Sequence, residues 1–206
     1  MQSKEHWERV YATKSPDEVS WFQEHAALSL KLIREAAVPT TAAFIDVGGG
    51  ASTLVDDLLA DGFDNITVLD LSGAALAAAK VRIGARSERV KWIEANILET
   101  QLPKHAFDVW HDRAVFHFLT SAKDHRAYVQ AVLRAVKPGG IVIVATFAED
   151  GPDKCSGLPV MRYGAKELHA EFGQPFQLLR HERETHVTPS GSEQKFVFCF
   201  CRKIAA

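Results

Sequence analysis

The sequence predicts a doubly wound α/β fold built on one mostly parallel sheet. Short β-branched and aromatic runs alternate with helix-length amphipathic segments, which is the pattern of a parallel sheet with crossover helices. Several of these runs are apolar on both faces, as expected of strands covered by helices on two sides. The chain then ends in two strand-like runs with no room for a helix between them.

Five runs are the expected parallel strands, and each is short and rich in β-branched or aromatic residues. They are "AFIDVG" (43–48), "NITVLDL" (65–71), "VKWIEANI" (90–97), "FDVWHDRA" (107–114) and "GIVIVATFA" (140–148). The two last runs, 176–188 and 193–204, are joined by the turn-prone "PSGS" and should pair antiparallel. The expected sheet therefore has seven strands.

Helix boundaries carry their own residue signals. The segment "STLVDDLLADG" has Ser52 as its expected cap and Gly62 as its stop, and "SGAALAAAKVRIG" starts at Ser72. A third helix, from Ser121, is expected to close at "KPGG" (137–140). We expect one domain, with a helical cap over 1–40 and an α/β core over 41–206.

Composition narrows the classes of partner. The formal net charge is −2 and the isoelectric point is about 6.5, so no basic field favours nucleic acid or an anionic membrane. No apolar run approaches the roughly 20 residues of a membrane span, and the N-terminal stretch is polar. The three cysteines indicate reduced thiols, and we expect a cytoplasmic protein; the sequence carries no signal for its oligomeric state.

A glycine loop lies between the first strand and the next helix, in "AFIDVGGGAST" (43–53). Glycines at such a junction let the backbone approach a ligand closely, and the helix start offers unpaired N–H groups. A dinucleotide fingerprint starting at Gly48 would need glycine at position 53, where this chain has Thr53. The sequence thus argues against a nicotinamide or flavin dinucleotide.

The segment "IDVGGGAS" resembles the Asp-x-Gly-x-Gly loop of class I S-adenosylmethionine-dependent methyltransferases, with Asp46, Gly48 and Gly50 in place and Ser52 where many relatives carry a third glycine. Twenty residues beyond Gly50, Asp70 ends the second strand, where a carboxylate can accept both hydroxyls of a ribose. "LRAVKPGGIVIVATF" is similar to the helix, turn and fifth strand of that family.

The resemblance spans roughly 41–148 and the terminal hairpin, and it implies a Rossmann-like sheet of order 3-2-1-4-5-7-6 with S-adenosylmethionine as cofactor. "WIEANIL" resembles the third strand, whose following Gly-Asp commonly meets the adenine and reads Ala95-Asn96 here. The cofactor-binding residues expected from it are Trp21, Phe22, Asp46, Gly48, Gly49, Gly50, Ser52, Asp70, Leu71, Asn96 and Ile97.

The N-terminal "HWERVYATKSPDEVSWFQEH" is similar to a subgroup that includes thiopurine-type methyltransferases and lysine methyltransferases, in which aromatic residues fold over the cofactor. Methyl transfer needs a short approach and exclusion of water, so a lid is expected. Trp7, Tyr11, Trp21 and Phe22 are its candidate residues. Helix packing on the sheet edge is an equally good reading for Trp7 and Tyr11, so we prefer the Trp21–Phe22 pair.

Charged residues follow the fourth strand, at the sheet edge where open α/β folds bind ligands. His111 or Asp112 is the candidate catalytic base, and Arg113 and His117 are candidate substrate contacts. The alternative is that Asp112 forms an ion pair with neighbours of Arg113, while the two histidines are polar residues at the edge of the core. The spacing of six between His111 and His117 matches no compact ligand motif, so we expect no metal.

The long segment 147–168 after the fifth strand is the expected second wall of a substrate pocket. Arg162 and Tyr163 could orient a substrate there, or Tyr163 could simply anchor a solvated loop. Cys199 and Cys201 share one strand face and are expected to pack in the core, although with Cys155 they could form a soft-ligand site.

These observations favour methyl transfer to a small-molecule nucleophile. Protein lysine N-methylation is the alternative enzyme, and a non-catalytic S-adenosylmethionine-binding module is the alternative outside enzymes. The sequence does not identify the acceptor, or whether N, O, S or C is methylated.

Overall fold

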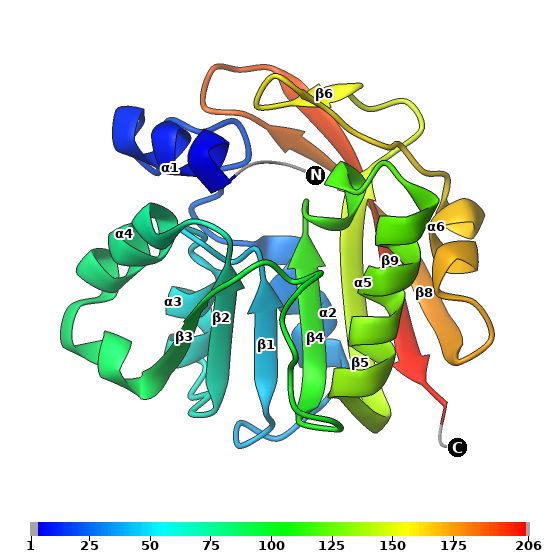
Figure 1. The fold of residues 1–206 in the computed structure, drawn as a ribbon. Helices are drawn as coiled ribbons and strands as arrows, with labels where there is room; N and C mark the ends of the chain where they lie inside the picture. The colour runs from blue at the N-terminus through cyan, green and yellow to red at the C-terminus, as the bar shows by residue number, and fades with distance from the viewer. Residues whose placement is uncertain (1–3, 205–206) are drawn as a thin grey trace.

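The computed structural model describes residues 4–204. It shows a seven-stranded sheet of order β3-β2-β1-β4-β5-β9-β8, in which the first five strands run parallel and β9 and β8 pair antiparallel at one edge (Figure 1). The strands are β1 (Phe44–Val47), β2 (Ile66–Asp70), β3 (Val90–Glu94), β4 (Phe107–Arg113), β5 (Val136–Phe147), β8 (Phe176–Val187) and β9 (Glu193–Lys203). The expected strand order is confirmed.

Six α-helices and two short 3₁₀ turns accompany the sheet among the described residues. They are α1 (Lys4–Thr13), α2 (Ala27–Glu35), α3 (Leu54–Ala60), α4 (Gly73–Ile83), α5 (Ala122–Ala135) and α6 (Ala165–Phe172), with η1 (Gly84–Arg89) and η2 (Phe116–Phe118). No helix in this part of the chain is long and apolar enough to cross a membrane.

Serine caps begin two of these helices as expected. The side chain of Ser72 accepts from the N–H of Ala75, and that of Ser121 accepts from the N–H of Asp124. Helix α3 begins one residue later than the expected cap allows: Thr53 occupies the cap position, and Ser52 Oγ accepts a hydrogen bond of 3.2 Å from Leu54 N.

Alternating side chains of the sheet pack into two apolar cores, one on each face. Phe44, Val68 and Ile143 join residues of α2 and α3, whereas Ile45 and Trp110 join residues of α5 and α6. Helix α2, which the sequence places in the N-terminal cap, buries Leu30, Leu32 and Ile33 in the first core. Of the N-terminal segment, therefore, α1 and the loop that follows it are the parts that lie over the sheet edge (Figure 1).

Two segments differ from the sequence-based expectation. The "KPGG" stretch, expected to close the α5 helix, lies within β5, because that strand already begins at Val136 and pairs with Phe107 of β4. The long loop after β5 contains a small antiparallel hairpin, β6 (Lys154–Cys155) and β7 (Leu158–Pro159). Figure 1 shows α1 and β6 on the same side of the molecule, above the carboxyl ends of the parallel strands.

Candidate active site

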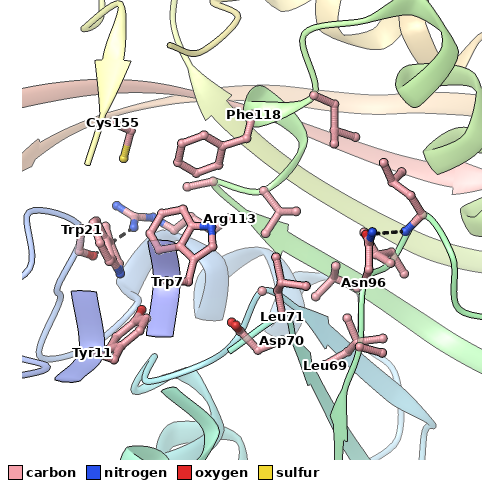
Figure 2. A pocket seen from close by; sticks show the side chains of 18 residues that line it. Trp7, Tyr11, Trp21, Leu69, Asp70, Leu71, Asn96, Arg113, Phe118 and Cys155 are labelled. Carbon is pink, nitrogen blue, oxygen red and sulfur yellow. Dashed lines mark hydrogen bonds between the residues drawn. The ribbon is translucent and has the colours of Figure 1, made fainter. Parts of the chain in front are cut away.

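Two neighbouring cavities lie at the carboxyl ends of β1, β2 and β4. The larger has an empty volume of about 900 Å³ including its open mouth, and its lining runs from Asp70 and Asn96 to Trp7, Phe118 and Cys155 (Figure 2). The smaller, of about 560 Å³, lies against the glycine loop. Both are lined by Tyr11, Trp21, Gly48 and Arg113. A long ligand could therefore extend from one into the other.

The glycine loop forms the wall between β1 and α3. Gly48 has φ +70°, and a Cβ there would lie 2.0 Å from Cγ2 of Val115. Gly50 has φ +26°, and a Cβ there would lie 2.5 Å from Oδ2 of Asp70. These positions accept only glycine without rearrangement, because the backbone conformation and the contact space both exclude a side chain.

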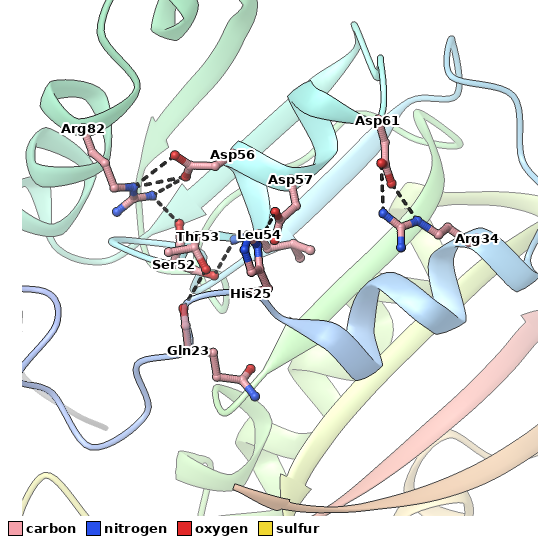
Figure 3. Close-up of polar contacts among 10 residues, drawn as sticks. All are labelled: Gln23, His25, Arg34, Ser52, Thr53, Leu54, Asp56, Asp57, Asp61 and Arg82. Carbon is pink, nitrogen blue, oxygen red and sulfur yellow. Dashed lines mark hydrogen bonds and ion pairs between the residues drawn. The ribbon is translucent and has the colours of Figure 1, made fainter. Parts of the chain in front are cut away.

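Side chains from distant elements brace this loop (Figure 3). Arg82 of α4 donates to the carbonyl oxygens of Ala51 at 2.7 Å and Ser52 at 2.6 Å, and it also pairs with Asp56. Thr53 Oγ1 donates to the carbonyl oxygen of Gln23 at 2.8 Å, which ties the loop to the N-terminal segment. The loop is therefore fixed before any ligand is bound.

Asp70, at the end of β2, lines the larger cavity. Its Oδ1 accepts a hydrogen bond of 2.8 Å from Ser72 N. The pKa of Asp70 is raised to about 7, chiefly by burial and also by nearby Asp46 and Glu8, while the Ser72 N–H opposes the shift. The cavity thus contains a half-buried carboxyl group whose two oxygens are both free to act as acceptors only when it is ionised.

Asn96 and the residues after β3 line the far end of the same cavity. The Asn96 side chain accepts from Leu98 N at 3.1 Å and donates to Glu99 at 2.9 Å, so it shapes its own loop. Leu71, Ile97 and Leu98 give this end of the cavity apolar surface.

This geometry agrees with what comparison with known proteins shows. A family model described as a methyltransferase domain matches residues 45–144, which run from β1 through the glycine loop and Asp70 into β5. Over residues 45–144 this chain therefore matches a methyltransferase domain.

A human EEF1A lysine methyltransferase 2 is 25% identical to it over 86% of this chain and 75% of that protein. The structure of N-methyltransferase NodS from Bradyrhizobium japonicum with S-adenosylhomocysteine has a TM-score of 0.73 at 15% identity, covering 95% of this chain and 97% of that one. A 1,6-didemethyltoxoflavin-N1-methyltransferase from Burkholderia thailandensis, also with S-adenosylhomocysteine, has a TM-score of 0.69 at 18% identity, covering 98% and 84%. The expectation of S-adenosylmethionine as cofactor agrees with these neighbours.

His111 of the methyltransferase domain is part of a buried hydrogen-bonded chain and not a free base. Its Nδ1 lies 2.7 Å from Oδ1 of Asp46, and its Nε2 lies 2.8 Å from Oγ of Ser29. Because the carboxylate accepts from Nδ1, Nε2 accepts from the serine hydroxyl in the neutral ring. His111 lines the smaller cavity, but both of its nitrogens are engaged.

Asp112, the other expected catalytic residue, lines neither cavity of the methyltransferase domain. It accepts from Val115 N at 2.8 Å and Phe116 N at 3.1 Å, and also from the hydroxyl of Tyr128. Burial raises its pKa to about 7, against these hydrogen bonds. The structure therefore corrects the expectation: Asp112 is completely buried and holds the turn after β4.

Arg113 lines both cavities, whereas His117 lines neither. The His117 ring is fully buried and accepts from Phe147 N at 3.3 Å through Nδ1. Burial, followed by the nearby Arg113 cation, lowers the His117 pKa to about 3. His117 is thus a neutral core residue, and its expected contact with substrate is not supported.

The loop after β5 contributes differently from the expectation. Cys155 lines the larger cavity of the methyltransferase domain, where burial raises its pKa to about 12. Arg162 is exposed and bonds to the carbonyl oxygen of Gly151, while Tyr163 is buried near His125. Neither of these two residues lines the larger or the smaller cavity, so the structure does not support their expected contact with substrate.

Aromatic residues cover the larger cavity. Trp7 makes edge contacts with Trp21 at 5.7 Å and with Phe118 at 5.3 Å between ring centroids. Trp21 also lies 6.3 Å from Tyr11, and Phe22 lines the smaller cavity. The preference for Trp21 and Phe22 alone was too narrow, because Trp7 and Tyr11 line the larger cavity as well.

Sequence reasoning missed three contributions to the site. Glu8 binds the start of α4, Phe118 lines the larger cavity, and Ser29 reaches His111 from 82 residues away. Only the position of Phe118, shortly after a strand that ends at the site, gives a sequence signal. No group of three His, Cys, Asp or Glu residues that could hold a metal occurs within 4–204.

Proposed function

We propose that this protein binds S-adenosylmethionine across the two cavities and transfers its methyl group to a small molecule. The observation that carries the proposal is the placement of Asp70 and the glycine loop on the walls of adjoining cavities at the carboxyl edge of the sheet. That edge is where open α/β folds bind nucleotide-like ligands.

The walls of the two cavities offer a suitable residue to each part of S-adenosylmethionine. Asp70 would accept the ribose hydroxyls, and Leu71, Ile97 and Leu98 would hold the adenine ring. The methionine end would extend along Gly48 and Gly49 into the smaller cavity, where Asp46 complements its ammonium group. The sulfonium would then lie where the cavities join. The bound cofactor supplies an electrophilic methyl group.

The rest of the larger cavity favours a compact acceptor. Trp7, Phe118 and Cys155 bound it, and α1 is fastened over it by Glu8 and Lys4, which contact Gly73 and Glu94. Such a cover excludes water from the reacting groups and orients the acceptor for in-line attack on the methyl group. Orientation of this kind supplies on the order of 7–11 kcal/mol of the barrier in favourable cases. The chain's residues would act here by positioning.

Lysine methylation is the second candidate, because the human relative named above is a lysine methyltransferase. A lysine side chain would have to enter beside the Arg113 guanidinium, whose charge opposes an ammonium group. The enclosing aromatic residues favour a compact acceptor over an extended peptide. A binding module without catalysis is the third candidate.

One assay separates these functions. The purified protein is incubated with methyl-labelled S-adenosylmethionine and cell lysate, which is then split into protein and small-molecule fractions. We expect label in the small-molecule fraction, and Asp70→Ala should abolish it. Label confined to protein would establish the lysine alternative. Tight cofactor binding with no label in either fraction would establish the binding module.

A cytoplasmic location is also part of the proposal. It is supported by Cys155, Cys199 and Cys201, all of which are free thiols. The net charge of −2 supports a partner other than nucleic acid. Cell fractionation with a tagged chain tests the location.

A further inference from the structure

The larger cavity has few side chains that could take a proton from an acceptor. Of the described residues that line it, the titratable ones are Tyr11, Asp70, Arg113 and Cys155. In the proposed function Asp70 is occupied by the ribose. Arg113 is a cation that donates to Glu184 at 3.2 Å, so it has no lone pair to offer. Tyr11 and Cys155 remain as candidate proton acceptors.

Tyr11 and Cys155 are both held in their protonated forms. Burial raises the pKa of the Cys155 thiol to about 12. Burial, together with the nearby Asp70 carboxylate, raises the pKa of Tyr11 well above its usual value. A general base is effective when its pKa lies near the operating pH. Neither group is therefore suited to removing a proton from an acceptor at neutral pH.

The histidines around the site have other partners. His111 contacts Asp46 and Ser29 through its two ring nitrogens, and the His117 ring lines neither cavity. His6 of α1 lies 3.2 Å from Oγ of Ser156 through Nε2, and it lines neither cavity either. An acceptor that has to lose a proton would find no positioned base among these histidines.

The wall away from Asp70 and the glycine loop is aromatic and apolar. Trp7 and Phe118 lie edge to face at 5.3 Å between ring centroids, and Val115 and Leu119 extend the same surface (Figure 2). An anion entering here would lose its hydration to apolar surface, which is costly. When a neutral acceptor attacks, the positive charge passes from the sulfonium to the attacking atom, and aromatic rings attract a cation throughout. The wall therefore suits a neutral acceptor.

We propose that the acceptor is a neutral aromatic heterocycle whose ring nitrogen attacks the methyl group. This inference rests on the proposed function and names its substrate class. The nitrogen lone pair forms the new N–CH₃ bond while the CH₃–S bond breaks. The electron pair of the broken bond stays on sulfur, which becomes the neutral thioether of S-adenosylhomocysteine, and the positive charge moves to the ring. A pyridine-type nitrogen carries no hydrogen, so the step needs no proton acceptor. The flat ring would pack against Trp7 and Phe118.

Isoquinoline, 1,2,3,4-tetrahydroisoquinoline and 2-naphthol test this assignment, because they share a two-ring frame and differ at the attacking atom. Isoquinoline has a free lone pair on nitrogen, tetrahydroisoquinoline is an ammonium ion at neutral pH, and 2-naphthol must lose its hydroxyl proton. Each compound is incubated with the purified protein and methyl-labelled S-adenosylmethionine, and the products are identified by mass spectrometry. We expect kcat/KM for isoquinoline to exceed that for either of the others by about 10²-fold or more, the usual contribution of a positioned base.

A variant of the aromatic wall tests where the ring binds. Phe118→Leu removes a ring that lines the larger cavity and not the smaller one. It should lower kcat/KM for isoquinoline by about tenfold and leave the Kd of S-adenosylhomocysteine within about twofold. Val81→Ala, at an exposed position of α4 outside both cavities, is the control and should change neither value.

The outcomes separate this inference from the proposed function. Faster methylation of tetrahydroisoquinoline or 2-naphthol than of isoquinoline would reveal a base at the site and overturn the inference. A preference for 2-naphthalenethiol, which supplies an anionic nucleophile, would overturn it as well. So would the absence of transfer to isoquinoline by a protein that binds S-adenosylhomocysteine. These results leave the proposed function intact, whereas a protein that does not bind S-adenosylhomocysteine would contradict the proposed function itself.

Discussion

The side chain of Glu8 accepts a hydrogen bond of 2.7 Å from the backbone N–H of Gly73. Glu8 belongs to α1, and Gly73 begins α4, three residues after Asp70. The other carboxylate oxygen accepts from Ala74 N at 3.3 Å. A carboxylate is favoured at a helix N-terminus, where N–H groups lack partners within the helix. Helix α1 is therefore held beside Asp70, the carboxylate that we propose binds the ribose.

Loss of the Glu8 hydrogen bonds should make helix α1 more mobile. We expect Glu8→Gln to increase amide hydrogen exchange across α1 and to speed cofactor dissociation several-fold, since charge-assisted hydrogen bonds are the stronger kind. Stopped-flow displacement and exchange mass spectrometry measure the two effects. Glu88→Gln, at an exposed position of η1, is the matched control and should change neither. Unchanged exchange in Glu8→Gln would show that α1 is held by its aromatic contacts alone.

Cofactor affinity should depend on pH through Asp70. Its pKa is raised to about 7 in the free protein, chiefly by burial, and only the ionised form accepts both ribose hydroxyls. Affinity for S-adenosylhomocysteine should therefore reach its maximum well above pH 7 and fall as the pH drops through this value. At pH 6 the Kd should be about tenfold higher than at this maximum. Calorimetry between pH 6 and 8.5 measures it.

The same site gives the control for this pH dependence. Asp70→Asn should bind weakly at every pH and show no such slope, because its side chain does not titrate. A slope of the same size in Asp70→Asn would assign the titration to another group.

Gly50→Ala should lower both stability and cofactor affinity. Its added Cβ would lie 2.5 Å from Oδ2 of Asp70 and so displaces that carboxylate. Gly191→Ala is the matched control, because Gly191 also has positive φ, +85°, but open space around it in the turn between β8 and β9. Both variants should lose roughly 1–2 kcal/mol from the left-handed backbone conformation. Only Gly50→Ala should lose affinity; normal binding by it would reduce the glycine loop to a structural turn.

His111→Leu should act on Asp46 and not on proton transfer. Removing the donor leaves a buried carboxylate oxygen unpaired, so we expect unfolding to become easier by about 1–3 kcal/mol and the KM for S-adenosylmethionine to rise. The kcat should change little. Steady-state kinetics and chemical denaturation test this expectation.

Ser29→Ala is the companion variant, because Ser29 bonds the other ring nitrogen. Ser29→Ala should also raise the KM for S-adenosylmethionine, but by less than His111→Leu does. A loss of kcat of about 10²-fold in His111→Leu, with the acid limb of the pH profile removed, would restore His111 as a general base.

The roles of the charged residues after β4 show where sequence reasoning stops. The sequence places His111, Asp112, Arg113 and His117 correctly at the carboxyl end of a strand, but successive residues of a strand point to opposite faces. On one face of the sheet His111 forms hydrogen bonds with Asp46 and Ser29, and on the other face Asp112 accepts a hydrogen bond from Tyr128. Of these four residues, only Arg113 lines both cavities. Which residue reaches a ligand depends on partners 16 to 82 positions away.

By itself the sequence determined the strands, the glycine loop and the position of Asp70, because these follow from local patterns of apolar runs, turn residues and strand ends. The order of the strands in the sheet was implied only by the resemblance to a known family. The sequence also determined the serine caps of α4 and α5. Tertiary structure alone decided that Glu8 binds the start of α4, that Trp7 covers the larger cavity and that His111 is held by two hydrogen bonds. These contacts join residues far apart in the chain, and the packing that brings them together leaves no periodic or local signal in the sequence.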